Sequence, residues 1–202
     1  MPSISYAITA HNEAIELERL LKQLSQSIRP IDEVVIQLDI TATPEVKYVV
    51  DNWPTMKRVD FALNGDFALF KNNLKSHCSK NYIFFIDADE YLSDGLLSNI
   101  NELLEINDGL VDVISVPRIN TVDGLTREHI DKWRWFVNED GWVNYPDYQT
   151  RICANKPEIQ WVNKVHERLS GWKIIANLPE GYDLIHPDRK STRLNSSHGY
   201  IS

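Results

Sequence analysis

Short apolar runs of strand length alternate with segments of helical periodicity along the first part of the chain. SISYAIT is a β-rich run, and the leucines that follow it recur at helical spacing. EVVIQLD, at residues 33–39, is nearly continuous in apolar side chains, as in a parallel strand buried on both faces. A second helix is predicted over residues 44–53, because Thr43 is a favoured N-cap and Pro44 is tolerated at the first helical position.

The same alternation continues as far as Pro117. A strand is predicted at residues 58–63, a helix after the capping residue Asp66, and a strand, YIFFID, at residues 82–87. YIFFID is the most apolar of these runs and is predicted to lie centrally. A helix after Ser93 then leads to VDVISVP, a strand that ends near Pro117. The alternation indicates an α/β fold with a mainly parallel central sheet, flanked by helices, that binds ligands at the carboxyl ends of its strands.

The composition changes over residues 118–188, where five tryptophans are interspersed with polar residues and no long helix is evident. We predict a loop-rich, partly β half that packs on the same sheet and shapes a site. A length of 202 residues is within the range of one domain. One domain is therefore expected over residues 1–188.

The last fourteen residues, RKSTRLNSSHGYIS at 189–202, contain three basic residues, four serines and no acid. They resemble a translated sequencing adapter, so we expect a non-native tail that is not part of the fold. Without its three cations, 18 basic residues face 29 acidic ones, and the formal charge is −11 rather than −8. This acidity argues against a nucleic-acid partner.

The two cysteines, Cys78 and Cys153, match no zinc or redox spacing, so we predict buried reduced thiols, which favour a cytoplasmic protein. The N-terminal segment lacks a basic region followed by an apolar stretch, and we expect no export signal. No window approaches the roughly 18 consecutive apolar residues of a membrane span. An integral membrane segment is therefore not expected.

Asp87 and Asp89 follow directly on the most apolar strand. Residues two apart in a strand project to the same side, and carboxylate oxygens suit Mg²⁺ or Mn²⁺, which completes its shell with phosphates. Such a cation neutralises a diphosphate leaving group as charge develops on it. The alternative is a loop that carries exposed acids with no ligand.

Several motifs in order resemble those of one enzyme family. The first half contains YAITAHNE, VVIQLD, GDFALFKN and YIFFIDADE, and the second half contains VPRIN, GWVNYPDYQTRI, VHERL and LIHPD. Their order and spacing are similar to those of family-2 glycosyltransferases, which have a GT-A type fold. The second half resembles the branch containing lipopolysaccharide-core glucosyltransferases. The resemblance implies a nucleotide-sugar-binding half at residues 1–117 and an acceptor and catalytic half at residues 118–188.

The resemblance also assigns residues to the nucleotide-sugar donor. Those implied are Ala10, Asn12, Glu13, Asp39, Asp66, Lys71, Asp87, Ala88 and Asp89. Asp39 is expected near the base or ribose, although Ile40-Thr41-Ala42-Thr43 replaces the small, glycine-containing stretch usual after it. Alternatively, Glu13 serves its helix dipole in the first turn and Lys71 is a solvated helix residue.

The implied metal ligands are Asp87, Asp89 and His186. A lone histidine is more often an ordinary hydrogen-bonded residue, and that alternative stays open for His186. An inverting transfer also needs a base for the acceptor hydroxyl, for which Asp147 and Glu167 are the candidates, with Asp147 preferred. Alternatively these acids form structural ion pairs.

Those alternative pairs would join Asp147 to Arg151 and Glu167 to Arg168. His166 is expected to line the acceptor site or to orient a phosphate.

The function implied is an inverting, metal-dependent transfer of a hexose from UDP to an acceptor hydroxyl on a glycan, a lipid-linked molecule or a protein. A nucleotidyltransferase is one alternative, but it normally has a glycine-rich, basic loop after the first strand, where this chain has TAHNEA. A non-catalytic sugar-binding relic of the fold is another alternative.

Overall fold

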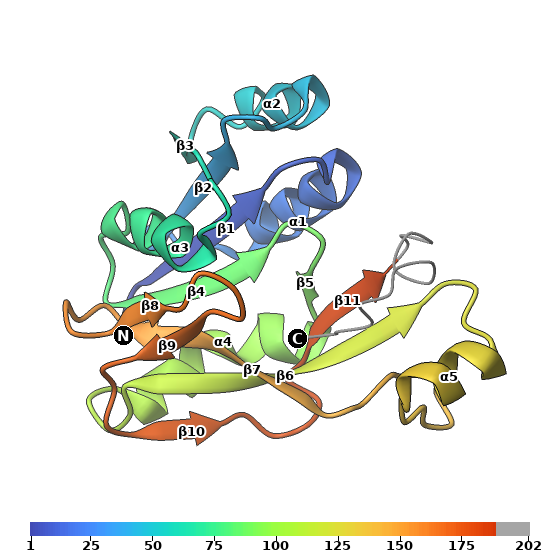
Figure 1. Ribbon diagram of the computed structural model, residues 1–202. Coiled ribbons are helices and arrows are strands. Elements are labelled where there is room, and N and C mark those ends of the chain that lie inside the picture. The colour runs from blue at the N-terminus through green and yellow to red at the C-terminus, as the bar shows by residue number, and fades with distance from the viewer. Residues whose placement is uncertain (189–202) are drawn as a thin grey trace.

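Residues 1–188, which the computed structural model describes, contain one large mixed sheet (Figure 1). The order of its strands is β3-β2-β1-β4-β7-β6-β11-β5, and β10 pairs with β6 beside this path. The strands are β1 (Ile4–Ala10), β2 (Glu33–Asp39), β3 (Lys57–Phe61), β4 (Tyr82–Asp87), β5 (Tyr91–Leu92), β6 (Val113–Val122), β7 (Asp147–Ala154), β10 (Ile175–Asn177) and β11 (Leu184–Asp188). The predicted tail at 189–202 lies outside the described residues.

The first four strands pair in parallel, and β7 joins antiparallel between β4 and β6. As predicted, YIFFID becomes the central strand β4, and its side chains are buried up to Ile86. A strand with neighbours on both sides and covered faces has no solvent-exposed surface, which explains its continuous apolar run. The α/β fold predicted from the alternation is confirmed.

Four of the five helices in the described chain begin at hydroxyl or carboxylate caps, and three of these caps were predicted from the sequence. Thr43 accepts a hydrogen bond from the Val46 amide before α2 (Pro44–Asp51), and Ser93 accepts one from the Leu96 amide before α4 (Asp94–Asn107). Asp66 does the same before α3 (Phe67–Ser76). These bonds satisfy amides that a helix leaves unpaired at its first turn, so the predicted starts are confirmed.

Helix α1 (Ala14–Ser27) buries its four leucines and packs beside α2, whereas α3 contacts β1, β2 and β3 away from them (Figure 1). The hairpin of β8 (Gln160–Val162) and β9 (Arg168–Ser170) contacts α3 through β8. No helix among residues 1–188 has the length and apolarity needed to cross a membrane.

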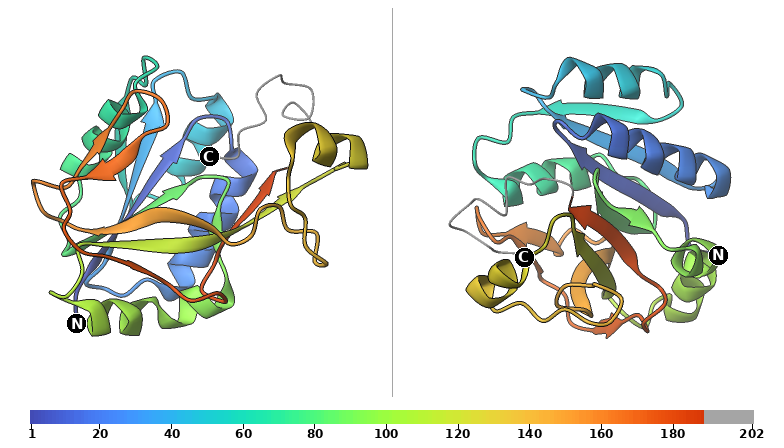
Figure 2. Two further views of the ribbon diagram at one scale, coloured as in Figure 1. Left: turned by 60° about the horizontal axis from the view of Figure 1, so that its bottom comes forward. Right: turned by 90° about the vertical axis from the view of Figure 1, so that its right-hand side faces the viewer.

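Strand β6 runs past its predicted end at Pro117 to Val122. Strand β7 pairs with one edge of β6. Along the other edge, β10 pairs with β6 as far as Ser115, and β11 pairs with it from Arg118 onward. Pro117 lies between these two pairings, where that edge has no strand partner, so its missing amide interrupts neither ladder. The second half thus continues the sheet, and helix α5 (Arg127–Trp133), which buries no residue, lies beyond the end of β6 (Figure 2).

Cys78 is half-buried and Cys153 is buried, and both are free thiols, as predicted. Burial raises the pKa of each thiol to about 12. Neither is therefore ionised at neutral pH, and neither has the thiolate character of a reactive cysteine.

Candidate active site

A cavity of about 830 Å³ opens at the carboxyl ends of β1, β2 and β4. Ligands of open α/β sheets bind at this edge. Among the residues implicated by sequence, those that line the cavity are Ala10, Glu13, Asp39, Lys71, Asp87, Ala88, Asp89, His166, Glu167 and His186. Asn12, Asp66 and Asp147 are not among its lining residues. The cavity therefore collects most, but not all, of the predicted site.

Asp39, at the end of β2, lines the cavity and joins two loops. Its Oδ1 accepts hydrogen bonds from the amide and the hydroxyl of Thr41, and its Oδ2 accepts one from the Leu63 amide at 2.7 Å. Burial alone would raise the pKa of Asp39, but these bonds hold it below its usual value. Thr41, within the unusual Ile40–Thr43 stretch, thus supplies donors that fix a charged carboxylate at the cavity wall.

Glu13 is the N-cap of α1 rather than a first-turn residue, but its carboxylate still lies near the positive end of the helix dipole. Its Oε2 accepts hydrogen bonds from the amides of His11 and Asn12, both at 2.9 Å. The carboxylate thereby closes the turn after β1. His11 lines the cavity with its Nε2 3.2 Å from the Thr41 hydroxyl, whereas Asn12 is exposed.

Asp66 serves as the cap of α3, with Oδ1 2.9 Å from the Leu69 amide. Lys71, one turn further along, is buried, so the alternative of a solvated lysine is wrong. Its Nζ lies 2.6 Å from Oε1 of Glu167 and 4.6 Å from the centre of the Trp161 ring. The structural partner of Glu167 is therefore Lys71 and not Arg168.

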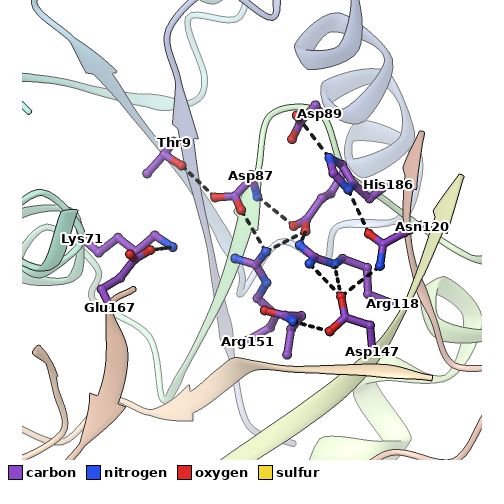
Figure 3. Close-up of polar contacts among 12 residues, drawn as sticks. Thr9, Lys71, Asp87, Asp89, Arg118, Asn120, Asp147, Arg151, Glu167 and His186 are labelled. Atoms are coloured by element: carbon purple, nitrogen blue, oxygen red, sulfur yellow. Dashed lines mark hydrogen bonds and ion pairs between the residues drawn. The ribbon is translucent and has the colours of Figure 1, made fainter. Parts of the chain in front are cut away.

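Asp87, at the end of β4, is held from two sides (Figure 3). Its Oδ1 accepts from the Thr9 hydroxyl at 3.1 Å, and its Oδ2 lies 2.8 Å from Nη2 of Arg151. Burial would raise the pKa of Asp87, but the charges of Arg151 and Lys71 hold it well below its usual range. Asp87 therefore carries its negative charge at any physiological pH.

Glu90 is fully buried and connects two arginines. Its Oε1 accepts from Nη2 of Arg151 at 2.6 Å and from Nη1 of Arg118 at 3.2 Å, while its Oε2 accepts from the Asp87 amide. The DADE segment that contains Glu90 was predicted to hold the diphosphate, but no individual role was predicted for Glu90, and Arg118 was not predicted as part of the site. The available signals were the acid that ends DADE, three residues after Asp87, and the arginine that follows the apolar run VDVISVP.

Asp147 pairs with Arg118, not with Arg151 as the structural alternative proposed. Its Oδ2 accepts from Nε and Nη2 of Arg118 at 3.0 and 2.7 Å and from Asn120 at 2.9 Å. Its Oδ1 accepts from Gln149 at 2.7 Å. Burial would raise the pKa of Asp147, but the charge of Arg118 lowers it. Both oxygens of Asp147 thus accept hydrogen bonds, and its lowered pKa makes it a weak base.

Asp89 and His186 both line the cavity and face each other, with 3.5 Å between Oδ2 and Nε2 (Figure 3). Nδ1 of the buried His186 lies 3.0 Å from Oδ1 of Asn120. Within residues 1–188, no three His, Cys, Asp or Glu side chains are grouped so that they could hold a metal ion. A carboxylate oxygen and an imidazole nitrogen still fit a divalent cation whose shell is completed by ligand phosphates.

The fold is similar to that of solved structures of S. aureus TarS. TarS 1-349 in complex with UDP-GlcNAc superposes with a TM-score of 0.65 at 13% identity, covering 98% of this chain and 62% of TarS 1-349. The complex with UDP gives 0.65 at 13% identity, covering 93% and 60%. This chain thus spans about 60% of that TarS chain. The described residues have a GT-A type fold.

Residues 5–160 match glycosyl transferase family 2, and the chain belongs to this family. No curated protein gives a significant match.

Proposed function

We propose that this chain transfers a hexose from a UDP-sugar to an acceptor hydroxyl with inversion at the anomeric carbon. The proposal depends on the cavity at the carboxyl edge of the sheet, which is lined by Asp39 on β2, by Asp89, which follows β4, and by His186 on β11, several strands away from β2 in the sheet. Family membership and the likeness to TarS bound to UDP-GlcNAc support the donor class. The nucleoside is assigned to the part of the cavity around Asp39 and the diphosphate to the part around Asp89.

The charges around the cavity support a bound cation. The charged side chains that line the cavity comprise three cations, from Lys71, Arg118 and Arg151, and six carboxylates, from Glu13, Asp39, Asp87, Asp89, Glu90 and Glu167. A diphosphate would add further negative charge to this excess. Mg²⁺ or Mn²⁺ held by Asp89 and His186, near Asp87, would stabilise the leaving UDP electrostatically.

Glu167 is the better candidate for the base. It lines the cavity and makes its ion pair through Oε1, whereas Asp147 has hydrogen bonds on both oxygens and does not line the cavity. In the proposed step the acceptor oxygen attacks the anomeric carbon and its proton passes to Glu167. The bond from that carbon to the diphosphate oxygen breaks, and UDP leaves with the bonding electrons.

The acceptor is assigned to the half of the cavity formed by residues 118–188, where His166 is exposed on the cavity wall. A glycan, a lipid-linked molecule or a protein hydroxyl remains the proposed acceptor class. The motifs of this half support a relationship to the lipopolysaccharide-core glucosyltransferases. The two free thiols support a cytoplasmic location.

Slow transfer to water tests the proposed reaction without knowledge of the acceptor. Purified protein with Mn²⁺ is incubated with α-linked UDP-glucose or UDP-GlcNAc, and the released sugar is followed by NMR from the first minutes. The β anomer is expected first, because attack opposite the leaving group inverts the carbon. First appearance of the α anomer would exclude inversion.

Two controls make the result specific. Glu167→Gln is expected to reduce turnover at least about 100-fold, the usual contribution of a general base, and the exposed Glu139→Gln is expected to leave it unchanged. Pyrophosphate release from UTP and a sugar phosphate, without donor hydrolysis, would favour the nucleotidyltransferase instead. Donor binding without either reaction would favour a binding relic.

A further inference from the structure

A row of polar side chains, buried apart from the half-buried Asp147, crosses three adjacent strands between Asp147 and His186. Asp147 is on β7, Asn120 on β6 and His186 on β11. His186 and Asn120 are direct partners in the parallel ladder of β11 and β6, and Arg118 and Asp147 are partners in the antiparallel ladder of β6 and β7. The strand register therefore brings these side chains together on one face of the sheet (Figure 3).

The chemistry of Asp147 fixes the orientation of the Asn120 amide. An ionised carboxylate only accepts hydrogen bonds, so the Asn120 group 2.9 Å from Oδ2 of Asp147 must be the Nδ2 donor. Arg118 binds the same oxygen through two nitrogens and keeps it in place. The opposite orientation would set two acceptor oxygens against each other at this distance. Oδ1 of Asn120 therefore faces His186.

This orientation decides which nitrogen of a neutral His186 carries the proton. Oδ1 of Asn120 has no hydrogen to give, so Nδ1 of His186, 3.0 Å away, must donate. Asn120 is 1% exposed and His186 is 5% exposed, so water does not compete for this bond. The lone pair of the neutral ring is then on Nε2, which faces Asp89 across 3.5 Å at the cavity wall.

We propose that Asn120 is a positioning residue that holds His186 in its Nδ1–H tautomer, so that Nε2 can share a divalent cation with Asp89. This inference rests on the proposed function for the identity of the cation. Partners of this kind, which bind the second ring nitrogen of a metal-binding histidine, fix its tautomer and ring orientation. Asp147 then acts through Asn120 as the fixed end of the row, not as the base.

The tautomer can be measured directly on the wild-type protein with Mg²⁺ and UDP, because only a cation relieves the repulsion between an unprotonated Nε2 and the Asp89 carboxylate 3.5 Å away. Long-range ¹H–¹⁵N NMR spectra of the imidazole rings are recorded at about pH 8.5, two units above the usual imidazole pKa of about 6.5. His186→Gln identifies the His186 signals by their loss. A protonated Nδ1 and an unprotonated Nε2 are expected. An Nε2–H ring, or a ring protonated at both nitrogens, would overturn the inference.

The positioning role is tested with Asn120→Leu, which is similar in size and has no acceptor. Loss of the Nδ1–H pattern is expected, together with about 10- to 100-fold weaker Mn²⁺ binding in the presence of UDP, measured by calorimetry. Asn99→Leu is the matched control, since the Asn99 side chain bonds only to the Gly95 carbonyl of its own helix among the contacts of the described chain. Unchanged tautomer and Mn²⁺ affinity in a folded Asn120→Leu protein would refute the role.

The two proposals fail in different ways. If wild-type protein with UDP binds Mn²⁺ but His186 has the Nε2–H tautomer, the inference is wrong and the proposed function stands. If the tautomer is Nδ1–H but Mn²⁺ and Mg²⁺ do not bind in the presence of any UDP-sugar tested, both the cation of the proposed function and this inference are overturned.

Discussion

Nη2 of Arg151 lies 2.8 Å from Oδ2 of Asp87, so a buried arginine determines the position of the carboxylate at the end of the central strand. The same nitrogen lies 2.6 Å from Oε1 of the buried Glu90. Burial alone would lower the pKa of Arg151, but Asp87 and Glu90 raise it above its ordinary value. Arg151 thus stays charged, and the buried carboxylate of Glu90 is needed to balance that charge.

Glu90→Gln is therefore expected to destabilise the protein. The change keeps the shape of the side chain but replaces the carboxylate that Arg118 and Arg151 share with a neutral amide. Breaking a buried ion pair typically costs about 3 to 5 kcal/mol. The free energy of unfolding from urea denaturation measures this loss. Glu139→Gln, at an exposed position, should remain within about 0.5 kcal/mol of wild type. Equal stability of the two variants would contradict a structural role for Glu90.

Gly171→Ala is expected to be more damaging than Gly141→Ala. Both glycines have positive φ, 85° and 80°, so both variants have the strain of an alanine in this region. Only at Gly171 would the new Cβ meet backbone, 1.9 Å from the carbonyl oxygen of Glu158, whereas at Gly141 it meets nothing within 4 Å. The melting temperature of Gly171→Ala should be clearly lower, and similar values for both variants would show that this close approach is wrong.

Asp39→Asn is expected to weaken UDP binding about tenfold. Both carboxylate oxygens accept hydrogen bonds, from Thr41 and from Leu63, and an amide has only one acceptor oxygen. One of the two loops must therefore separate from residue 39. Calorimetry with UDP measures the effect, with the exposed Asp60→Asn on β3 as control. Wild-type affinity in Asp39→Asn would remove this residue from the nucleoside site.

The ionisation of Asp112 is expected to make the stability of the folded protein depend on pH in the acid range. The ion pair with Lys156 and the bonds from the Lys173 and Ile174 amides lower its pKa to about 2. The folded pKa is below the unfolded value of about 3.9, so the stabilisation is complete above that value and is lost as the pH falls towards 2. Wild type should thus exceed Asp112→Asn in stability at pH 6, by a margin that shrinks between about pH 4 and pH 2. A constant margin over that range would show that ionisation of Asp112 is not its source.

Local signals in the sequence predicted the first half of the fold. Thr43, Asp66 and Ser93 begin helices because a cap and the amides it satisfies lie within three residues of each other. The course of β6 beyond Pro117 was not predictable in this way, since it depends on which strands pair with each part of its edge.

The candidate site, too, was predictable from sequence only where the signal was local. Asp39 and the Asp87–Asp89 segment were predicted from strand ends, and both line the cavity. The partners of Asp147 and Glu167 were predicted wrongly, because sequence proximity suggested Arg151 and Arg168. The observed partners, Arg118 and Lys71, lie 29 and 96 positions away and come together only through strand pairing and the approach of the β8–β9 hairpin to α3.

The central claim, a UDP-sugar site that uses Asp89, is tested most directly by calorimetric titration of UDP-GlcNAc and UDP-glucose into wild type and Asp89→Asn, with and without Mn²⁺. At least one donor should bind the wild type in the presence of Mn²⁺, and binding should weaken at least about tenfold when Mn²⁺ is omitted or Asp89 is replaced. Equal binding by both proteins, or no binding of either donor to the wild type, would contradict the account.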